Sequence, residues 1–460
     1  MTIQEIMSLP SDQNRVAALK EKSIALRPWG TLRGLQREYE SAYHPVMNRA
    51  LYPDIANPDG TLEQVTRITL DFQKLATKRM TELVCGIPVK RVYNAVNDKQ
   101  KEVASWLEAI FVRNRIDSVN VARCNQLFAG CEIMTLWYAV EQPTLIYGFK
   151  SNLKMRCRTF SPMLGDELYP LFDEYGDMTA MSVGYKRKVG GRTMSFFDTY
   201  TADRHVKWSG DGGGWTVVED EWITLGKIPA IYCHRPSPIW EDTSKLVYEM
   251  EWALSRNGNY LRKNSKPLFV VFADEQIAYG DEKDSDARSV MQYPKDSKAD
   301  YVTWQQAVEN LKFYVNELRN SFFTQLQLPD WSYEKMSQQA MSGESRKQLF
   351  IDSQLKVKDE SGRLLEFFDR EVNVVKAFTK QAAPAGYEND IDALQVETII
   401  TPFSITDDKD TITNLVTATG GKAIMSQQEA IRNLGWSDDV SETMRQIAAE
   451  NQQDVFQPYE

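Results

Sequence analysis

Three long helical stretches in the second half of the chain constrain its fold more than any other feature. Residues 242–266 have the pattern of one uninterrupted helix, roughly 37 Å long at ~1.5 Å per residue. One stripe of this helix carries Leu246, Met250, Ala253, Asn257 and Leu261. Residues 305–327 predict a second helix, in which apolar residues recur at alternating steps of three and four: Val308, Leu311, Val315, Leu318 and Phe322. Such a seam is suited to packing against another helix.

A third helix is predicted from about residue 345 to 379, with Ser361-Gly362 midway as a plausible kink site. Between the first two helices lies a polar insertion with extended segments, and Leu328-Pro329 ends the second helix. The stretch up to Ser342-Gly343 has no apolar period, so we interpret it as an irregular loop. Long helices separated by an insertion and a loop serve assembly more naturally than they serve a catalytic pocket.

The first half of the chain predicts a mixed region of helices followed by an antiparallel sheet. Helical spacing covers residues 61–85, 99–113 and 118–128. From about residue 132 to 231, short β-branched and aromatic runs alternate with Gly, Asp and Asn. We therefore expect an α+β fold.

The net charge of −10 is confined to the C-terminal sixth of the chain. Residues 383–460 contain 14 acidic and 4 basic residues, so the first 382 residues carry 50 of each sign and are neutral. The net charge of −10 argues against a basic protein that coats DNA or a membrane.

Signatures of enzymes and cofactor sites are sparse. The chain has three histidines, which are scattered, and five cysteines without a C-x-x-C pair. This pattern excludes a disulfide framework and a Cys-rich zinc site and is typical of a reducing compartment. Without an apolar run near 18 residues or a signal-peptide pattern, we expect a soluble protein made in the cytoplasm, without cofactor or metal.

Seven short islands in a fixed order carry a family resemblance. The islands are Tyr43-His44-Pro45, Cys85-Gly86-Ile87-Pro88, Phe128-Ala129-Gly130-Cys131, Tyr200-Thr201-Ala202-Asp203, Leu225-Gly226-Lys227-Ile228-Pro229, Ser342-Gly343-Glu344-Ser345, and Ser426-Gln427-Gln428-Glu429-Ala430 followed by Trp436-Ser437-Asp438-Asp439. Each island is weak alone, but the collinear series over about residues 30–445 is specific. In this series the chain resembles the portal proteins of tailed bacteriophages, particularly the branch that also serves siphoviruses of Gram-positive hosts.

The resemblance implies a non-enzymatic virion protein, assembled in the host cytoplasm as a cyclic homo-oligomer, usually a dodecamer, at the capsid portal vertex. Through this ring terminase packages double-stranded DNA, which is later ejected into the tail. The ring also nucleates head assembly and docks head-tail adaptors, so the implied partners are itself, DNA, terminase, adaptor, and major capsid and scaffold proteins, with no membrane.

The domain order implied by the family follows the predicted elements. A wing would span 1–241, a first stem helix 242–266, a clip 267–303 and a second stem helix 304–327. A tunnel loop at 328–343, a kinked wing helix with a return strand at 344–406, and a small acidic crown at 407–460 complete the order. The chain departs from the family in its short tail after Trp436, so the crown should be small.

Three groups of residues are candidates for contact with DNA or partners. The DNA-facing candidates in the tunnel loop are Trp331, Tyr333, Lys335, Met336 and Met341, and the candidates for the stem lumen are Lys263 and Lys266. One lysine per subunit would become a ring of charge under cyclic symmetry. The alternative is that the positive charges of the stem lysines only stabilise the negative, C-terminal end of the helix dipole. The clip candidates for docking are Asp281, Glu282, Asp284 and Asp286, which could equally form an unstructured acidic loop.

Two other groups of residues are open to more than one interpretation. The basic run 186–188 with Arg192 could touch nucleic acid, although the solvated tip of a hairpin is favoured. The carboxylates Asp407, Asp408 and Asp410 could hold a metal in an enzyme, although acids at a helix start are favoured by capping and dipole alone. Another minor head or assembly protein with long interface helices is the remaining alternative function.

Overall fold

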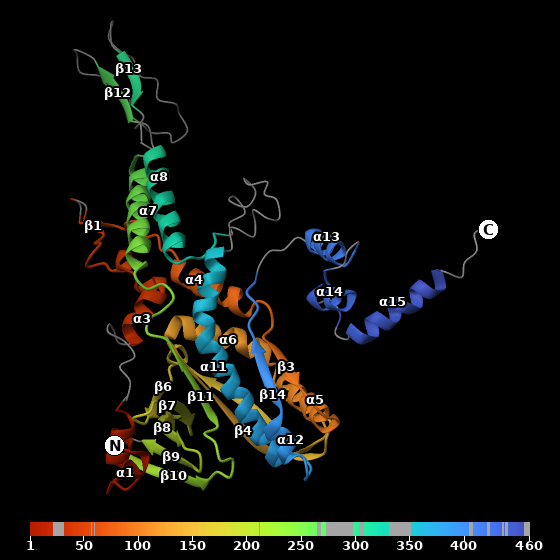
Figure 1. The fold of residues 1–460 in the computed structure, drawn as a ribbon. Helices are drawn as coiled ribbons and strands as arrows, with labels where there is room; N and C mark the ends of the chain where they lie inside the picture. Colours follow the sequence, from red (N-terminus) through yellow and green to blue (C-terminus); the bar gives the residue numbers. More distant parts are fainter. Residues whose placement is uncertain are drawn as a thin grey trace.

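The computed structural model describes residues 1–21, 32–56, 58, 60–210, 212–264, 268–272, 298–302, 308–330, 351–403, 408–420, 424–434, 437 and 440–454. Its elements form an elongated body (Figure 1). The β12–β13 hairpin (Leu268–Phe272 and Lys298–Val302) lies at one end, and the paired helices α7 (Ser244–Asn264) and α8 (Val308–Gln325) follow it. A mixed α/β body completes the molecule, and a five-stranded sheet forms its far end. The α+β class expected from the sequence is confirmed.

The main core lies between helices and a three-stranded sheet. The helices are α4 (Phe72–Cys85), α5 (Asp98–Arg113), α6 (Ile116–Gly130) and the 32-residue α11 (Ile351–Ala382). The sheet has the antiparallel order β11–β4–β5 (Ala230–His234, Glu132–Thr144 and Ser151–Phe160). The largest side chains buried between these layers include Phe111, Phe128, Trp137, Phe367 and Phe368. Burial of these side chains stabilises the packing of the helices on the sheet.

Local backbone geometry sets the turns between these helices and the sheet. The Asn97 side chain accepts a hydrogen bond from the N–H of Gln100 and so caps the start of α5. Arg115, with φ of 51°, lies in the left-handed region between α5 and α6, and Cys131, with φ of 65°, ends α6 in the same region. These two residues reverse the chain sharply enough for α6 to return onto α4 and for β4 to begin at once.

The second sheet is an antiparallel meander of β6 to β10. The strands are β6 (Glu167–Phe172), β7 (Met178–Val189), β8 (Arg192–Tyr200), β9 (Arg204–Gly210) and β10 (Trp215–Trp222), in spatial order β10–β9–β8–β7–β6. Ile6 of α1 (Ile3–Met7) and Leu19 of α2 (Asp12–Leu19) are buried against Phe197 and Trp208 of this sheet. The antiparallel sheet predicted for this region is confirmed.

Smaller elements surround the two sheets. They are α3 (Leu32–Tyr39), the 3-10 turns η1 (Ser41–Tyr43), η2 (Pro45–Met47) and η3 (Pro162–Leu164), and the two-stranded pair β1 (Ile55–Ala56) and β2 (Leu62–Glu63). Strand β3 (Lys90–Asn94) pairs antiparallel with β14 (Gln395–Ile399), which follows α12 (Glu388–Ala393). Helices α13 (Asp408–Thr419), α14 (Gln427–Leu434) and α15 (Val440–Asp454) contact one another and stand away from the body (Figure 1). Across the described residues, none of the helices combines the length and apolar character needed to span a bilayer.

The three long helices exist close to their predicted places, but the start of another predicted helix and part of the stripe predicted on α7 differ. The helix predicted over 61–85 begins only at Phe72, because the residues before it are held extended along α7, as described below. The stripe predicted on α7 is buried at Met250, whereas Leu261 is 51% exposed. Helix α11 continues through Ser361 and Gly362 as one element.

Candidate functional site

The foot of the α7–α8 pair is where the predicted loop leaves and re-enters the body. Helix α8 ends at Gln325, the chain is described to residue 330, and it is described again from the start of α11 at residue 351. The hydroxyl of Ser353 donates a hydrogen bond to the carbonyl of Gln327 at 3.2 Å. The described residues on the two sides of segment 331–350 are therefore adjacent in the fold.

The outgoing side of this point is anchored in the core. Phe322, Phe323 and Leu326 are buried at the end of α8, and the left-handed residue Gln327, with φ of 53°, turns the chain. Beyond it, Arg319 pairs with Asp330 at 3.0 Å across the turn. A shallow hollow of about 290 Å³ opens between this turn and the start of α11. The end of α8 and the turn after it are therefore held by packing and by an ion pair.

The seam predicted on α8 has the expected burial where side chains are described. Leu311, Val315 and Leu318 are half-buried and Phe322 is buried. The neighbouring Phe313 and Tyr314 are 68% and 43% exposed, and the Tyr314 hydroxyl reaches across to the Glu249 carboxylate on α7 at 3.1 Å. The pair therefore has one packed side and one side with aromatic groups open to a partner.

A polar stripe on α7 holds residues 66–70 as an extended segment. The side chains of Glu251, Ser255 and Asn259 accept the N–H groups of Leu70, Ile68 and Thr66, respectively. Four helical residues rise about 6 Å, and two extended residues rise about 6.6 Å. The two spacings match over three successive contacts, which explains why this segment is extended although its apolar spacing suggests a helix.

Gly258 lets the extended segment approach α7 closely. A Cβ atom at this position would lie 2.9 Å from Cγ2 of Thr66. The absence of a side chain at Gly258 therefore allows the segment to pack closely on α7, since any side chain would press against the segment.

His44 and Glu251 form a buried pair at the same place. Nδ1 of His44 lies 2.7 Å from Oε1 of Glu251, and Nε2 lies 2.9 Å from the carbonyl of Glu38. The Glu38 carbonyl accepts, and a carboxylate at Glu251 also accepts, so this geometry favours the protonated imidazole, in which both ring nitrogens donate. Burial alone would lower the pKa of His44, but the hydrogen bonds to Glu251 and to the Glu38 carbonyl outweigh it, and the pKa is raised.

A second buried ion pair fixes α11 against α6. The guanidinium of Arg123 donates to both carboxylate oxygens of Glu371 at 2.8 and 2.7 Å, and the indole N–H of Trp137 donates to the same carboxylate at 2.9 Å. Phe367 and Phe368 lie against the guanidinium, with ring centroids 4.7 and 5.1 Å away. The paired charge is thereby enclosed between α6, β4 and α11.

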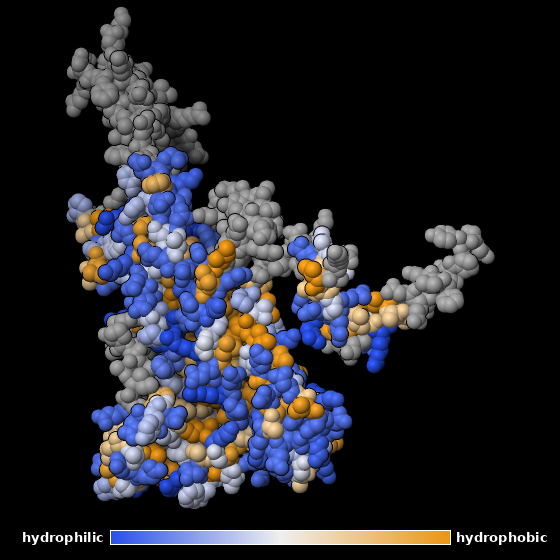
Figure 2. All heavy atoms as spheres, in the orientation of Figure 1, coloured by the Kyte–Doolittle hydropathy of each residue, from blue (hydrophilic) through white to orange (hydrophobic). Residues whose placement is uncertain are grey.

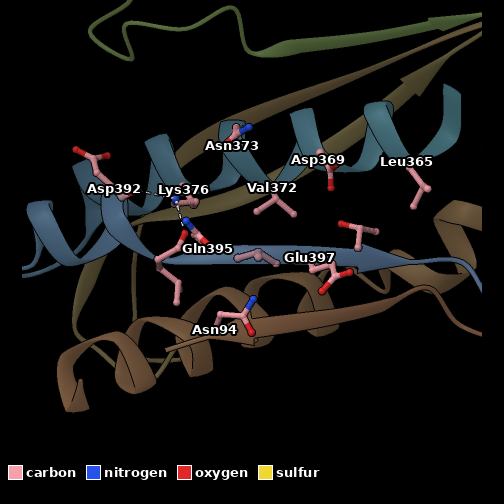
Figure 3. Close-up of a pocket in the computed structure, with 12 residues that line it drawn as sticks. Asn94, Leu365, Asp369, Val372, Asn373, Lys376, Asp392, Gln395 and Glu397 are labelled. Atoms are coloured by element: carbon pink, nitrogen blue, oxygen red, sulfur yellow. Dashed lines mark hydrogen bonds between the residues drawn. The ribbon is translucent and has the colours of Figure 1, made fainter. Parts of the chain in front are cut away.

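An open groove of about 600 Å³ runs between α11 and β14 (Figure 3). Lys376 crosses one end and donates to the carbonyls of Asp392 and Leu394, which ties α11 to the α12–β14 turn. Asp369 and Glu397 lie at the other end. The residues that line this groove include no histidine or cysteine, so it offers no obvious nucleophile with a base.

The site residues predicted from the sequence fall outside the residues whose side chains are described. Lys263 lies within α7, but its side chain is not described. The other stem candidate and all candidates of the tunnel loop and the clip lie outside the described residues. They are Lys266, Trp331, Tyr333, Lys335, Met336, Met341, Asp281, Glu282, Asp284 and Asp286. Three carboxylates were alternative candidates for metal ligands. Asp407 lies outside the described residues, and Asp408 and Asp410 lie in α13, but their side chains are not described. These assignments remain predictions.

Sequence reasoning missed the residues that build the foot of the pair. His44 lies in a quoted island, but nothing in the sequence links it to Glu251, which is 207 residues away. The i, i+4, i+8 spacing of Glu251, Ser255 and Asn259 is visible in the sequence and was a usable signal for a polar contact along α7.

Comparison with known proteins gives one family match. The model of the family described as "Phage portal protein, SPP1 Gp6-like" matches residues 27–456. The comparison with curated proteins finds no match. Among solved structures, a chain in the neck of an empty GTA particle computed with C6 symmetry is 11% identical, with a TM-score of 0.41 and coverage of 86% of this chain and 95% of that chain. A chain in the virion of a native gene transfer agent particle is 11% identical, with a TM-score of 0.40 and coverage of 92% and 98%.

Proposed function

The chain belongs to the SPP1 Gp6-like family of phage portal proteins, and on this basis we propose that it forms a ring at one capsid vertex through which terminase packages double-stranded DNA. The same ring would later pass the DNA into the tail, nucleate head assembly and dock head-tail adaptors. The portal family is a structural one, and its members are components of the virion. Family membership therefore favours this function over an enzyme or an unrelated assembly protein.

The proposed domain map follows the family order. Residues 1–241 would form the wing, α7 and α8 the stem, and the segment that contains β12 and β13 the clip. Residues 328–343 would form the tunnel loop, 344–406 the wing helix and return strand, and 407–460 the crown. The lengthwise succession of β12–β13, the α7–α8 pair and the body supports this map (Figure 1).

The observation that carries the proposal is the pinned base of segment 331–350. The Ser353 hydroxyl donates to the carbonyl of Gln327 and Arg319 pairs with Asp330, so the described residues on the two sides of the segment are held together at the foot of the α7–α8 pair. This closure supports a tunnel loop over the predicted residues. Under cyclic symmetry such a loop is repeated around the axis and can narrow a channel. Lys335 would then supply one positive charge per subunit, and Trp331, Tyr333, Met336 and Met341 would supply an apolar collar.

Exposed apolar side chains support contact between subunits. Leu261 on α7 and Phe313 on α8 are exposed, and at the start of α11 Ile351 and Leu355 are 49% and 54% exposed. Figure 2 shows apolar residues gathered beside α11 in the middle of the visible face. Apolar groups on long helices are the kind of surface that a permanent ring buries.

Charge supports passage without tight binding. Residues 383–460 carry the whole net charge of −10. In a ring of twelve subunits this amounts to on the order of −120 formal charges near the inner entrance of the channel. Salt screens these charges beyond about 8 Å at physiological ionic strength. The acidic clip residues 281–286 would dock terminase or an adaptor by electrostatic steering.

Electron microscopy of the purified full chain tests the proposal. We expect rings with a central hole wide enough for a duplex, and native mass spectrometry would count the subunits. A chain that stays monomeric over the concentration range used for assembly would contradict the proposal.

The role of Lys335 is tested separately in assembled particles. Lys335→Glu should change the length of packaged DNA, because one negative charge per subunit would face the phosphates. Lys78→Glu, at a 72% exposed side chain on α4, is the matched control. Unchanged packaging in the Lys335 variant would contradict a contact between this residue and DNA.

A further inference from the structure

The hairpin formed by β7 and β8 extends beyond the sheet to which it belongs. The last pair with β6 joins Gly184 to Glu167, and the last pair with β9 joins Ser195 to Gly210. Beyond these, β7 and β8 pair only with each other through three further residue pairs, ending at Val189 and Arg192. The protruding ribbon is roughly 10 Å long at ~3.3 Å per residue. We call the ribbon over residues 186–195 the basic arm.

The basic arm carries four cations and no acidic residue. Lys186, Arg187, Lys188 and Arg192 are all exposed. None of the four forms an ion pair with a carboxylate in the described part of the chain, whereas Arg204 and Lys207 of the adjacent β9 pair with Asp220 and Glu219. The arm therefore presents unneutralised positive charge beside a region whose other cations are paired.

The cations occupy both faces of the ribbon. Side chains alternate along a strand, and residues directly opposite each other point to the same face. Lys186 and Lys188 share one face, while Arg187 shares the other with Arg192, which lies opposite Val189. A flat protein surface would meet only one of these pairs. The major groove of a duplex is about 12 Å wide, admits a two-stranded ribbon and has phosphates along both walls.

The tip of the arm is stripped of side chains. Gly190 and Gly191 have φ of 57° and 81°, and a Cβ atom at either would meet nothing within 4 Å. These φ values favour glycine in a tight hairpin turn. The bare turn also lets the backbone enter a narrow groove, which a bulkier tip would resist.

The position of the arm matches the proposed function, on which this step rests. The five-stranded sheet lies at the end of the body opposite to the β12–β13 hairpin (Figure 1). If β12–β13 belongs to the clip on the outside of the capsid, the sheet faces the interior, where the packaged genome lies. We propose that the basic arm binds the phosphate backbone of packaged double-stranded DNA without sequence preference, at a site separate from the channel.

Binding of a short duplex to the full chain tests the proposal. A fluorescent 12-base-pair duplex would be titrated by anisotropy at several salt concentrations, with the wild type and a variant carrying Lys186→Gln, Arg187→Gln, Lys188→Gln and Arg192→Gln. Each lost phosphate contact makes the slope of log K against log salt shallower by about 0.9. We expect a change of roughly 3 to 4 if all four cations contact phosphates.

Two further variants separate charge at the arm from total charge and from folding. Lys78→Gln, Arg113→Gln, Lys150→Gln and Arg156→Gln together remove four exposed cations elsewhere and should leave the slope unchanged. Lys186→Arg with Lys188→Arg keeps the charge and should keep the binding. Equal slopes in the arm variant and the control variant would overturn the proposal.

The same assay distinguishes DNA from an acidic protein segment as the partner of the arm. A labelled peptide of residues 407–460 carries the acid of the proposed crown, so it represents an acidic segment from a neighbouring subunit. If this peptide binds the arm and the duplex does not, the proposal is overturned. The outcome is independent of ring formation: absent rings in the microscope would contradict the proposed function, whereas the salt slope reports the arm alone.

Discussion

At the residue scale, the buried pair of Arg123 and Glu371 ties α11 to α6 in the main core. Both side chains are 1% exposed, and each oxygen of the carboxylate accepts from the guanidinium. Removal of one partner leaves an uncompensated buried charge, which costs about 3–5 kcal/mol. We expect Arg123→Met and Glu371→Leu each to lower the Tm by several degrees.

The double variant Arg123→Met/Glu371→Leu completes this test. Replacement of both charges by apolar groups of similar size is often nearly neutral, so its Tm should exceed that of either single variant. Calorimetry on all four proteins measures this coupling. Additive losses in the double variant would contradict a pair that acts as a unit.

His44 predicts a pH dependence whose sign follows from its raised pKa. In the unfolded chain the pKa of histidine is about 6.5. Because the folded pKa is higher, the stabilisation is fully present below about pH 6.5 and is lost as the pH rises through the folded value. The difference in Tm between the wild type and His44→Gln should therefore be larger at pH 5.5 than at pH 8.5.

His205 is the matched control because its pKa is shifted in the opposite direction. Burial lowers the pKa of His205, which stacks on Tyr200. Protonation at low pH therefore opposes folding, and the Tm difference between the wild type and His205→Gln should grow as the pH rises. Identical pH profiles for the two variants would refute the assignment of a charged His44.

At the element scale, the register between α7 and residues 66–70 decides where α4 begins. Gly258→Ala should weaken this contact, because the new Cβ would lie 2.9 Å from Thr66. Ser255→Ala should weaken it by about 1–3 kcal/mol, because the N–H of Ile68 loses its acceptor. Hydrogen exchange at residues 66–70 should accelerate in both variants. Gly362→Ala, at a helical glycine with open space around it, should leave the exchange unchanged.

The elements also show how far local pattern carries. The periodicity of α7, α8 and α11 predicts their existence and approximate ends, since each has a long regular apolar spacing. The same reasoning misplaces the start of α4. Residues 62–70 contain apolar groups at helical spacing, but the hydrogen bonds offered by Glu251, Ser255 and Asn259 come from a helix almost 200 residues later.

At the scale of the whole molecule, exposed aromatic groups on the proposed stem predict assembly behaviour. Phe313 is 68% exposed in the single chain. If the ring buries it, Phe313→Glu should shift the mass seen by native mass spectrometry from ring to monomer, while circular dichroism of the monomer stays native. Tyr175→Glu, at an 84% exposed aromatic between β6 and β7, should leave the ring intact. A Phe313→Glu protein that still forms full rings would place this residue outside the subunit interface.

The sequence by itself determined the α+β class, the long helices, the concentration of acid in the last sixth of the chain and, through its ordered islands, the family. These features are local or additive, so they can be counted along the chain. Only the tertiary structure decided that His44 meets Glu251, that Arg123 meets Glu371, that residues 66–70 lie extended on α7, and that Gln327 after α8 meets Ser353 of α11. Each of these contacts joins residues far apart in the sequence, and burial fixes them through partners that no local period encodes.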